Sequence, residues 1–356
     1  MVAEVVTVTQ ETQSGSGSPN GDRYDVVVVG GGAAGLSAAL MLGRARRSVL
    51  VIDAGQPRNA PAAHVHGFLS RDGVPPGDLL EAGRREVAGY GGEVHVGRAL
   101  SAARDGDGLT VEIDGGGTVR ARRLLVTTGI TDELPDVPGL RARWGRDVLH
   151  CPYCHGWEFR DEPIGVLATG PMGVHQALLF RQWTDRLTLL LHTGPRPTSE
   201  QAEQLAARDI TVIPGEVTGL EVAEDSLAGA RLRTGELIPL RALAVAPRAV
   251  PRAEVLASLG LEPTPHPSGF GAYFAADPTG LTSVPGVWVA GNVADPTANV
   301  LAAATAGSSA AGAINADLIA EDTRRAVQAR ATVSVFSAES EAQLCTLIMG
   351  DRRHGL

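Results

Sequence analysis

Two cysteines separated by two residues, Cys151 and Cys154, have the spacing in this sequence that most clearly suits chemistry. Thiols at this spacing can close a disulfide across one turn of chain, and a position at a helix N-terminus lowers the pKa of a cysteine. A histidine flanks the pair on each side, His150 and His155. Because an imidazole with a pKa of about 6.5 can take a proton from a thiol and hold it, we expect these four residues to form a catalytic redox centre.

A metal site and a covalent haem site are the alternative interpretations of this cysteine pair. Structural zinc sites need four ligands, often two such pairs. The sequence has only three cysteines, so we predict no metal. Haem attachment to Cys-x-x-Cys-His requires an exported protein, and residues 1–21 lack the basic start and apolar run of a signal peptide. We expect a flexible leader there and a cytoplasmic protein.

The composition is typical of a globular protein. Its 356 residues exceed what one hydrophobic core usually serves, so we expect two domains. The net charge of −9 argues against a nucleic-acid partner. No apolar stretch approaches the roughly 20 residues that span a bilayer, so we expect no membrane partner. All 31 basic residues are arginines, which excludes a mechanism that depends on lysine, such as a Schiff base or a P-loop.

A glycine-rich turn follows the first strongly apolar run of the sequence. Residues 24–29 are mostly valines, which is typical of a strand buried on both faces. The turn has the dinucleotide-binding pattern G-x-G-x-x-G and leads into a predicted helix over residues 36–46. Its three glycines are Gly30, Gly32 and Gly35. In order, they permit the tight turn, the approach of the backbone to a pyrophosphate and close helix–strand packing.

An acidic residue ends the second predicted strand, residues 48–52. Asp53 lies about 20 residues beyond Gly30, where a carboxylate can accept hydrogen bonds from the ribose of an adenine nucleotide. The strand, turn, helix, strand and acid occur in the order of a Rossmann unit, and we expect Ala33 and Ala34 of the turn to contact the nucleotide as well. The motif alone does not choose between FAD and NAD.

Two later strands indicate which protein family has this arrangement. Residues 124–129 are predicted to form a strand that ends in Thr128-Gly129. Residues 281–292 are predicted to form a strand that ends in Gly-Asn, and a small-residue helix follows over 302–314. Together with the first unit and the cysteine pair, these segments resemble the low-molecular-weight thioredoxin reductase family over about residues 23–322. The resemblance implies an α/β fold with two Rossmann-like dinucleotide-binding domains, the first of which binds FAD.

The resemblance also assigns cofactor contacts beyond the first unit. In the family, the strand end at Thr-Gly closes over FAD, and the late Gly-Asp segment holds its ribityl chain. Here asparagine replaces that aspartate, and the segment before the last helix lacks the family's arginine. The additional residues expected at FAD are Arg58, His66, Thr128, Gly129, Asn292, Asn299 and Val300.

The same resemblance divides the chain into a discontinuous FAD-binding domain and an inserted NAD(P)H-type domain that carries the cysteine pair. The expected parts are a leader (1–21), the FAD-binding domain (22–137 and 266–325), the inserted domain (138–265) and a C-terminal tail (326–356). We expect a short surface or interface helix in the tail over 342–349, with Cys345 as a small hydrophobic residue. A lid is the alternative for that helix. A homodimer is implied by the family alone.

The second Rossmann-like unit departs from the pattern that binds a coenzyme. Its predicted strand, 164–168, ends with Ala168 at the first glycine position, and Pro171 in the turn has no backbone N–H for a pyrophosphate. After the next predicted strand, 187–191, a single arginine, Arg196, stands where NADPH-using relatives carry a pair. We therefore expect this coenzyme site to be degraded.

The histidines at the cysteine pair resemble a subgroup of the family, the flavin-dependent dithiol oxidases that close disulfides in natural products such as gliotoxin, holomycin and romidepsin. Thioredoxin reductases carry an acidic residue where this chain has His155. The resemblance implies that Cys154 lies beside FAD and that Cys151 exchanges with a small-molecule dithiol. It also implies O₂ as the electron acceptor, with H₂O₂ as product. An NAD(P)H-dependent thioredoxin reductase and a flavin-binding sensor with a thiol switch are the alternatives.

Overall fold

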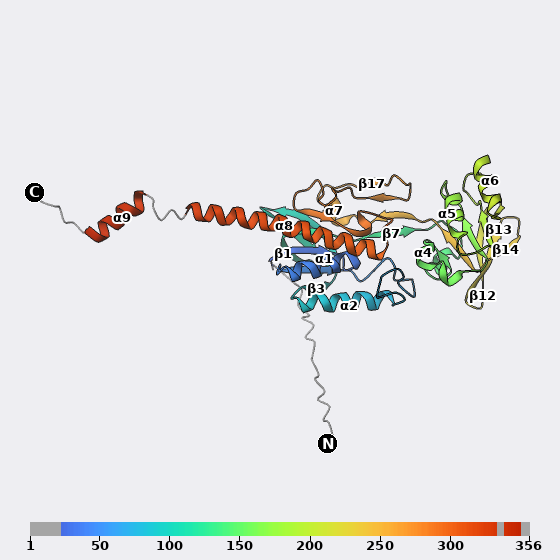
Figure 1. Cartoon of the computed structure of the whole chain (residues 1–356), viewed down its shortest axis with the longest axis horizontal. Helices are drawn as coiled ribbons and strands as arrows, with labels where there is room; N and C mark the ends of the chain where they lie inside the picture. The colour runs from blue at the N-terminus through green and yellow to red at the C-terminus, as the bar shows by residue number, and fades with distance from the viewer. Residues whose placement is uncertain (1–22, 333–337, 350–356) are drawn as a thin grey trace, which may run out of the picture. The chain divides into compact units, whose positions relative to one another are not determined.

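The computed structural model describes residues 23–332 and 338–349 (Figure 1). The expected leader, residues 1–21, lies outside the described residues. The chain divides into two compact units, Met1–Ala311 and Gly312–Leu356. Among the helices in the described ranges, none has the length and apolar character of a membrane span.

The first unit contains a seven-stranded sheet with the order β3-β2-β1-β6-β5-β4, and β19 also pairs with β6. Its strands are β1 (Arg23–Val29), β2 (Val49–Asp53), β3 (Glu93–Val96), β4 (Ala99–Asp105), β5 (Gly108–Ile113), β6 (Gly117–Val126) and β19 (Val287–Val289). β1, β2, β3, β6 and β19 run parallel, whereas β5 is antiparallel to both of its neighbours, β4 and β6. Val26, Val27 and Val28 of β1 are fully buried, which confirms the prediction of a strand covered on both faces.

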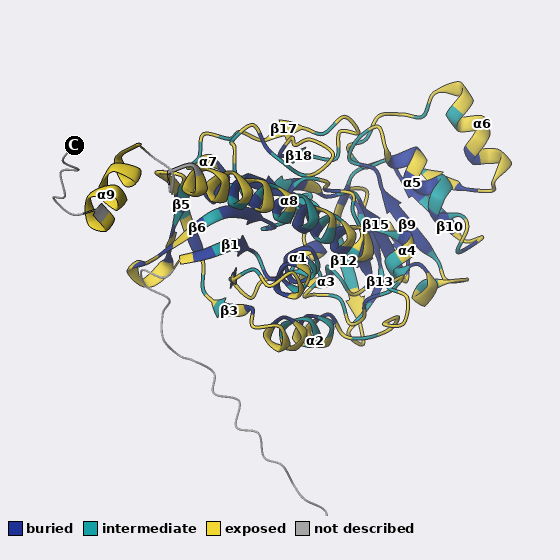
Figure 2. Cartoon of the chain, turned by 60° about the vertical axis from the view of Figure 1, so that its left-hand side comes forward, coloured by how far each residue is buried: buried dark blue, intermediate teal, exposed yellow. Residues whose placement is uncertain are grey.

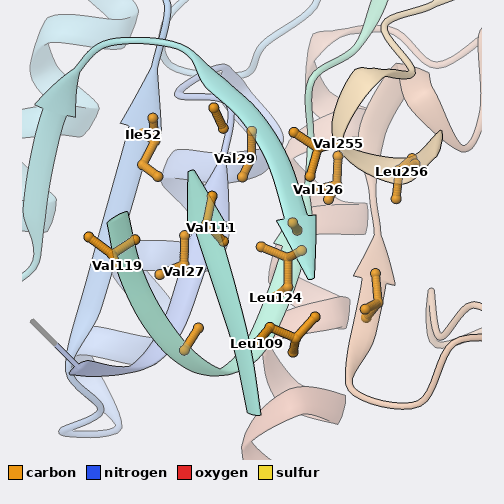
Figure 3. Packing of buried hydrophobic residues seen from close by; sticks show 14 of the residues in the cluster. Val27, Val29, Ile52, Leu109, Val111, Val119, Leu124, Val126, Val255 and Leu256 are labelled. Atoms are coloured by element: carbon orange, nitrogen blue, oxygen red, sulfur yellow. The ribbon is translucent and has the colours of Figure 1, made fainter. Parts of the chain in front are cut away.

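One of the hydrophobic cores joins the early strands to a segment that follows much later in the chain. Figure 3 shows valines, leucines and isoleucines of β1, β2, β5 and β6 packed against Val255 and Leu256 of the short helix α7 (Glu254–Ala257). Each such side chain contributes roughly 1.5–3 kcal/mol when it is fully buried. The part of the chain after residue 250 therefore returns to the first sheet.

The residues between these two parts of the chain form a second parallel sheet. Its order is β11-β10-β9-β15-β8, and a separate antiparallel sheet has the order β12-β13-β14. The strands are β8 (Val148–Leu149), β9 (Ile164–Leu167), β10 (Leu187–Leu190), β11 (Thr211–Ile213), β12 (Val217–Ala223), β13 (Ser226–Leu232), β14 (Leu237–Pro239) and β15 (Ala242–Val245). Two Rossmann-like sheets in one chain confirm the expected α/β fold class.

The chain passes between the two sheets through two strands that pair with each other. β7 (Ile130–Glu133) leads out of the first sheet and β16 (Arg248–Pro251) leads back. They are antiparallel, with Glu133 opposite Arg248 and Ile130 opposite Pro251. A further short pair, β17 (Thr264–Pro265) and β18 (Ala272–Tyr273), follows α7.

Helices cover the sheets and fill their connections. In Figure 2 the strands of both sheets are mostly buried, whereas most of α6 is exposed. Besides α7, the α-helices are α1 (Ala33–Arg44), α2 (Pro76–Gly89), α3 (Leu140–Arg143), α4 (Pro152–His155), α5 (Gly173–Phe180), α6 (Ser199–Ala207), α8 (Val300–Thr332) and α9 (Ala338–Met349). Within the described ranges, short 3₁₀ helices occur at η1 (Asp114–Gly116), η2 (Trp157–Phe159) and η3 (Gly291–Val293).

The late strand and the last long helix differ in extent from the sequence-based predictions. The strand predicted over 281–292 contains only β19, because Gly286, with φ of +83°, turns the chain and Leu281 bridges back to Trp288 in the antiparallel sense. The helix predicted over 302–314 is the beginning of α8. Gly307 of α8 lies so close to α1 that a Cβ there would be 1.9 Å from the Ala34 carbonyl oxygen, so the small residues of α8 permit backbone contact.

The second unit contains the end of α8 and the whole of α9. The helix expected over 342–349 is therefore present within α9. Cys345 is exposed on this helix, and its expected role as a small hydrophobic residue of a surface or interface helix remains a prediction. Leu347 and Ile348 are exposed as well.

Candidate active site

The turn between β1 and α1 has the geometry that its glycine pattern predicts. Gly30 has φ of +106°, a conformation that favours glycine. A Cβ at Gly35 would lie 1.9 Å from the Gly30 carbonyl oxygen, so this position holds the helix against the strand. A Cβ at Gly32 would meet nothing within 4 Å, and Gly32 begins α1 without a side-chain cap. The backbone at Gly32 is therefore open to an anionic ligand at the helix N-terminus.

Asp53, at the end of β2, closes the other side of this turn. One carboxylate oxygen accepts a hydrogen bond from the backbone N–H of Gly55 at 3.2 Å. The other carboxylate oxygen lies 3.1 Å from Nη2 of Arg84 on α2. No sequence pattern predicts this partner. A Cβ at Gly31 would be 2.6 Å from the Asp53 carboxyl carbon, so the turn and the acid are in direct contact. This arrangement fits the predicted ribose site.

A cavity of about 370 Å³ connects the glycine turn with the cysteine pair. Every predicted catalytic and cofactor residue lines it except Gly35, which packs beneath the turn. The structure also places residues there that the sequence reading missed, among them Asp132, Trp144 and Arg252. Segments far apart in sequence thus form one continuous site.

The cysteine pair is placed by one turn of helix. Cys151 stands at the N-cap of α4, and the backbone N–H of Cys154 donates to the Cys151 carbonyl oxygen at 3.2 Å. Both thiols are free and half-buried, and Cys154 Sγ donates a hydrogen bond to Cys151 Sγ at 2.7 Å. The pair is therefore in position for thiol–disulfide exchange.

The two thiols differ in acidity. The hydrogen bond from Cys154 lowers the pKa of Cys151 to about 7, with smaller contributions from the backbone N–H groups of Cys154 and Tyr153 and from the charge of Arg58, while burial opposes the shift. Donation of its proton to Cys151 raises the pKa of Cys154, and burial adds to the rise. In the reduced pair the thiolate consequently resides on Cys151 and the proton on Cys154.

Both flanking histidines are neutral at pH 7. His150 stacks on Phe270, with ring centroids 4.8 Å apart, and its Nδ1 lies 3.4 Å from the Val245 carbonyl oxygen. Burial, with help from the charge of Arg58, lowers the pKa of His150 to about 4. Burial also lowers the pKa of His155, whose two ring nitrogens are shielded from solvent and have no hydrogen-bond partner among the described residues. Both imidazoles are therefore free to accept a proton, but a pKa of about 4 makes His150 a weak base toward a thiol.

Arg58 and His66 lie on the loop that follows β2, and both contact other parts of the site wall. The Arg58 guanidinium donates to both carboxylate oxygens of Asp132 at 2.8 Å. His66 lies between two carboxylates, 3.3 Å from Asp72 through Nδ1 and 3.3 Å from Glu158 through Nε2. The expected contacts of both residues with FAD remain predictions.

Three other predicted cofactor residues also have protein partners. The Asn292 amide nitrogen donates to the carbonyl oxygens of Asp295 at 3.1 Å and Ala298 at 2.8 Å, so only its side-chain oxygen is left for a ribityl hydroxyl. Asn299 Oδ1 accepts the backbone N–H of Ala302 at 2.8 Å at the start of α8. Thr128 Oγ1 donates to the Arg252 carbonyl oxygen at 2.8 Å.

A smaller cavity of about 200 Å³ marks the turn of the second Rossmann-like unit. The Cβ of Ala168 fills the space there, because a Cβ at Gly173 or Gly194 would lie 2.5 or 2.8 Å from it. Pro171 and Arg196 both line this cavity. The degraded coenzyme site remains a prediction that these positions support.

Comparison with known proteins defines the class. Residues 24–311 match the family described as pyridine nucleotide-disulphide oxidoreductase. The chain belongs to this family, whose thioredoxin reductase-like members are FAD-binding flavoproteins, and it is an oxidoreductase with FAD as cofactor. The open backbone at the glycine turn and the adjoining acid fit that cofactor.

Comparison with individual relatives indicates which members of the family this chain resembles. Thioredoxin reductase sirT of Leptosphaeria maculans is 30% identical over 317 residues, which cover 84% of this chain and 95% of that protein. The crystal structure of HlmI is 48% identical, with a TM-score of 0.82, and the match covers 88% of this chain and 97% of that one. The putative thioredoxin reductase TrxB from Bacillus anthracis is 27% identical, with a TM-score of 0.78 and coverage of 84% and 99%. The chain is thus a thioredoxin reductase-like flavoprotein, as its motifs predict.

Proposed function

We propose that this protein is an FAD-dependent dithiol oxidase that forms an intramolecular disulfide in a small-molecule dithiol of the natural-product type, with O₂ as acceptor and H₂O₂ as product. The observation that carries the proposal is the state of the cysteine pair. A thiolate-prone Cys151 is hydrogen-bonded to Cys154 between two neutral histidines, and all four residues line the cavity that begins at the glycine turn.

The reaction starts with the oxidised pair, Cys151–Cys154. One substrate thiol gives its proton to His150 or His155, and its sulfur attacks Cys151 Sγ. The enzyme disulfide breaks, its bonding electrons go to Cys154, and a mixed disulfide joins Cys151 to the substrate. Cys154 then takes up a proton, in keeping with its raised pKa.

The second substrate thiol closes the product. After loss of its proton, it attacks the substrate sulfur of the mixed disulfide, so that the substrate disulfide forms and Cys151 leaves as a thiolate. Because a thiol of lower pKa is the better leaving group, the pKa of about 7 at Cys151 favours this step. The substrate has lost two electrons and two protons; the pair has gained both electrons and one proton, on Cys154, and the second proton passes through a histidine to solvent. Bound FAD supplies the two-electron acceptor that connects the reduced pair to O₂.

The second Rossmann-like unit supports this direction of electron flow. Ala168 occupies the turn, Pro171 has no backbone N–H to donate, and Arg196 is a single arginine. An oxidase needs no nicotinamide reductant, so the loss of a nicotinamide coenzyme site would not impair its reaction. The likeness to HlmI, at 48% identity, exceeds that to the proteins above that bear the name thioredoxin reductase.

One mixing experiment separates the alternatives. The FAD-loaded protein is mixed under argon with NADPH or with dithiothreitol, and the flavin absorbance is followed before and after air is admitted. Bleaching by the dithiol alone, reversed by O₂ with formation of H₂O₂, is the expected result. Bleaching by NADPH would instead identify a thioredoxin-type reductase, and no response to either would favour a thiol switch. Cys151→Ser should abolish dithiol turnover while FAD stays bound.

The proposal also includes the domain division and the assembly. We propose that 22–137 with 266–325 form the FAD-binding domain, that 138–265 form the inserted domain, and that two copies associate as a homodimer. Sedimentation of the FAD-loaded protein tests the dimer, and a monomer at micromolar concentration would contradict it.

A further inference from the structure

Arg58 is a half-buried cation with a fixed orientation in the active-site cavity. It lies on the loop after β2, and its bidentate partner Asp132, on β7, has a side chain only 7% exposed. The guanidinium also donates to the Pro296 carbonyl oxygen at 3.3 Å. A planar guanidinium held by two parallel hydrogen bonds to one carboxylate has little freedom to turn, so its charge stays in one place.

The charge of Arg58 reaches the reacting groups. It favours the thiolate form of Cys151 and of Cys154, and it disfavours the protonated form of His150. The other ionisable groups that act on these three are the partner thiol of each cysteine, Asp132 and His155 at His150, and Glu158 at Cys154. Backbone hydrogen bonds add to them, from Cys154 and Tyr153 at Cys151 and from Val245 at His150. Arg58 is the cation common to all three.

We propose that Arg58, clamped by Asp132, is a positioning residue that supplies the fixed positive charge for the Cys151 thiolate released when the product disulfide closes. In that step the bond between Cys151 and the substrate sulfur breaks, the electron pair stays on Cys151, and a new sulfur–sulfur bond forms within the substrate. The inference rests on the proposed function only in taking Cys151 as the exchanging sulfur.

The test measures the acidity of Cys151 without any turnover. In a Cys154→Ser, Cys345→Ser background, Cys151 is the single thiol of the chain. The rate of its alkylation by iodoacetamide is measured against pH in the FAD-saturated protein, and FAD affinity is measured beside it. Arg58→Gln should raise the midpoint pH by about one unit, which slows alkylation below the midpoint about tenfold. Arg58→Lys, which keeps a charge but cannot make the bidentate pair, should give an intermediate midpoint.

Arg248→Gln is the matched control. It removes the same charge and breaks an ion pair with Glu133, the neighbour of Asp132 in β7, but the Arg248 side chain is exposed and does not line the cavity. Its midpoint should equal that of the background protein. Melting temperatures of all variants confirm that they fold.

Three results would overturn the inference. An unchanged midpoint in Arg58→Gln together with weaker FAD binding would make Arg58 a cofactor contact and nothing more. Equal shifts in Arg58→Gln and Arg248→Gln would reflect net charge alone. If Arg58→Gln does not fold, a midpoint in Arg58→Lys equal to the background would show that a clamped guanidinium is not required. An absence of oxidase activity in the unmodified protein would refute the proposed function but leave this measurement intact.

Discussion

A matched pair of substitutions, Gly32→Ala and Gly35→Ala, tests whether FAD binds at the glycine turn. Both add one methyl group to the same turn, but the surroundings differ. At Gly35 the new Cβ would lie 1.9 Å from the Gly30 carbonyl oxygen and 2.7 Å from Thr127 Oγ1, so backbone must move. Overpacking against backbone costs about 3 kcal/mol, the upper part of the usual range. The melting temperature of the apoprotein should therefore fall by several degrees.

At Gly32 the added methyl group meets no protein atom within 4 Å, and φ of −78° suits alanine. The loss of glycine at the N-cap and the reduced freedom of the unfolded chain act in opposite directions, so the apoprotein should melt within about 1 °C of the unmodified protein. A pyrophosphate against this backbone would meet the methyl group, however. We expect FAD affinity to fall by about tenfold to a hundredfold, which corresponds to about 1.4–2.8 kcal/mol.

The assay combines thermal melting of each apoprotein with titration of FAD by quenching of its fluorescence. The reasoning fails if Gly32→Ala binds FAD as tightly as the unmodified protein, because the pyrophosphate then lies elsewhere. It also fails if Gly35→Ala melts at the unmodified temperature, because the close contact between helix and strand would then be absent.

Three further outcomes are expected. Burial holds the pKa of His150 at about 4, below its unfolded value of about 6.5. Between these values the unfolded chain binds a proton that the folded chain does not, so stability should fall as the pH is lowered from 6.5 to 4. The melting temperature of His150→Phe should depend less on pH, and an equal dependence would contradict this. Arg143→Met should destabilise the fold by about 3–5 kcal/mol, because it leaves the buried carboxylate of Asp147 without its ion-pair partner. Arg231→Met, which breaks an exposed pair with Glu221, should cost less than about 1 kcal/mol. Equal losses of melting temperature in the two variants would be inconsistent with this difference in burial. Ala168→Gly should not restore flavin bleaching by NADPH, since Pro171 and Arg196 remain, and restored bleaching would show that one methyl group alone blocks the coenzyme.

The parts of the fold that could be predicted are those with a local cause. Consecutive valines predict β1, and glycines at fixed intervals predict the turn that follows, because burial and backbone geometry act within a few residues. The strand predicted over 281–292 was too long because the pattern of apolar residues continues through the turn at Gly286. Apolar periodicity does not reveal where a chain reverses direction.

Within the candidate site, residue types could be predicted but their partners could not. Arg58 and Asp132 are 74 positions apart, and no spacing rule connects them. The same holds for His66 and Glu158, which come from different elements and meet only in the folded chain. Asn299, predicted at the flavin, caps α8 by a contact that is local and could have been read from its position before the helix.

The antiparallel pairing of β7 with β16 has an evolutionary consequence. The chain leaves the first sheet and returns to it at adjacent points, as the hydrogen bond from the Arg252 N–H to the Gly129 carbonyl oxygen, 3.1 Å long, also shows. The residues between these strands form an insertion that is joined to the rest of the chain at two adjacent points. Its sequence can diverge, and a coenzyme site within it can decay, without changing the register of the strands that hold the other nucleotide. A lineage could therefore lose one cofactor while the sheet that binds the second one stays as it was.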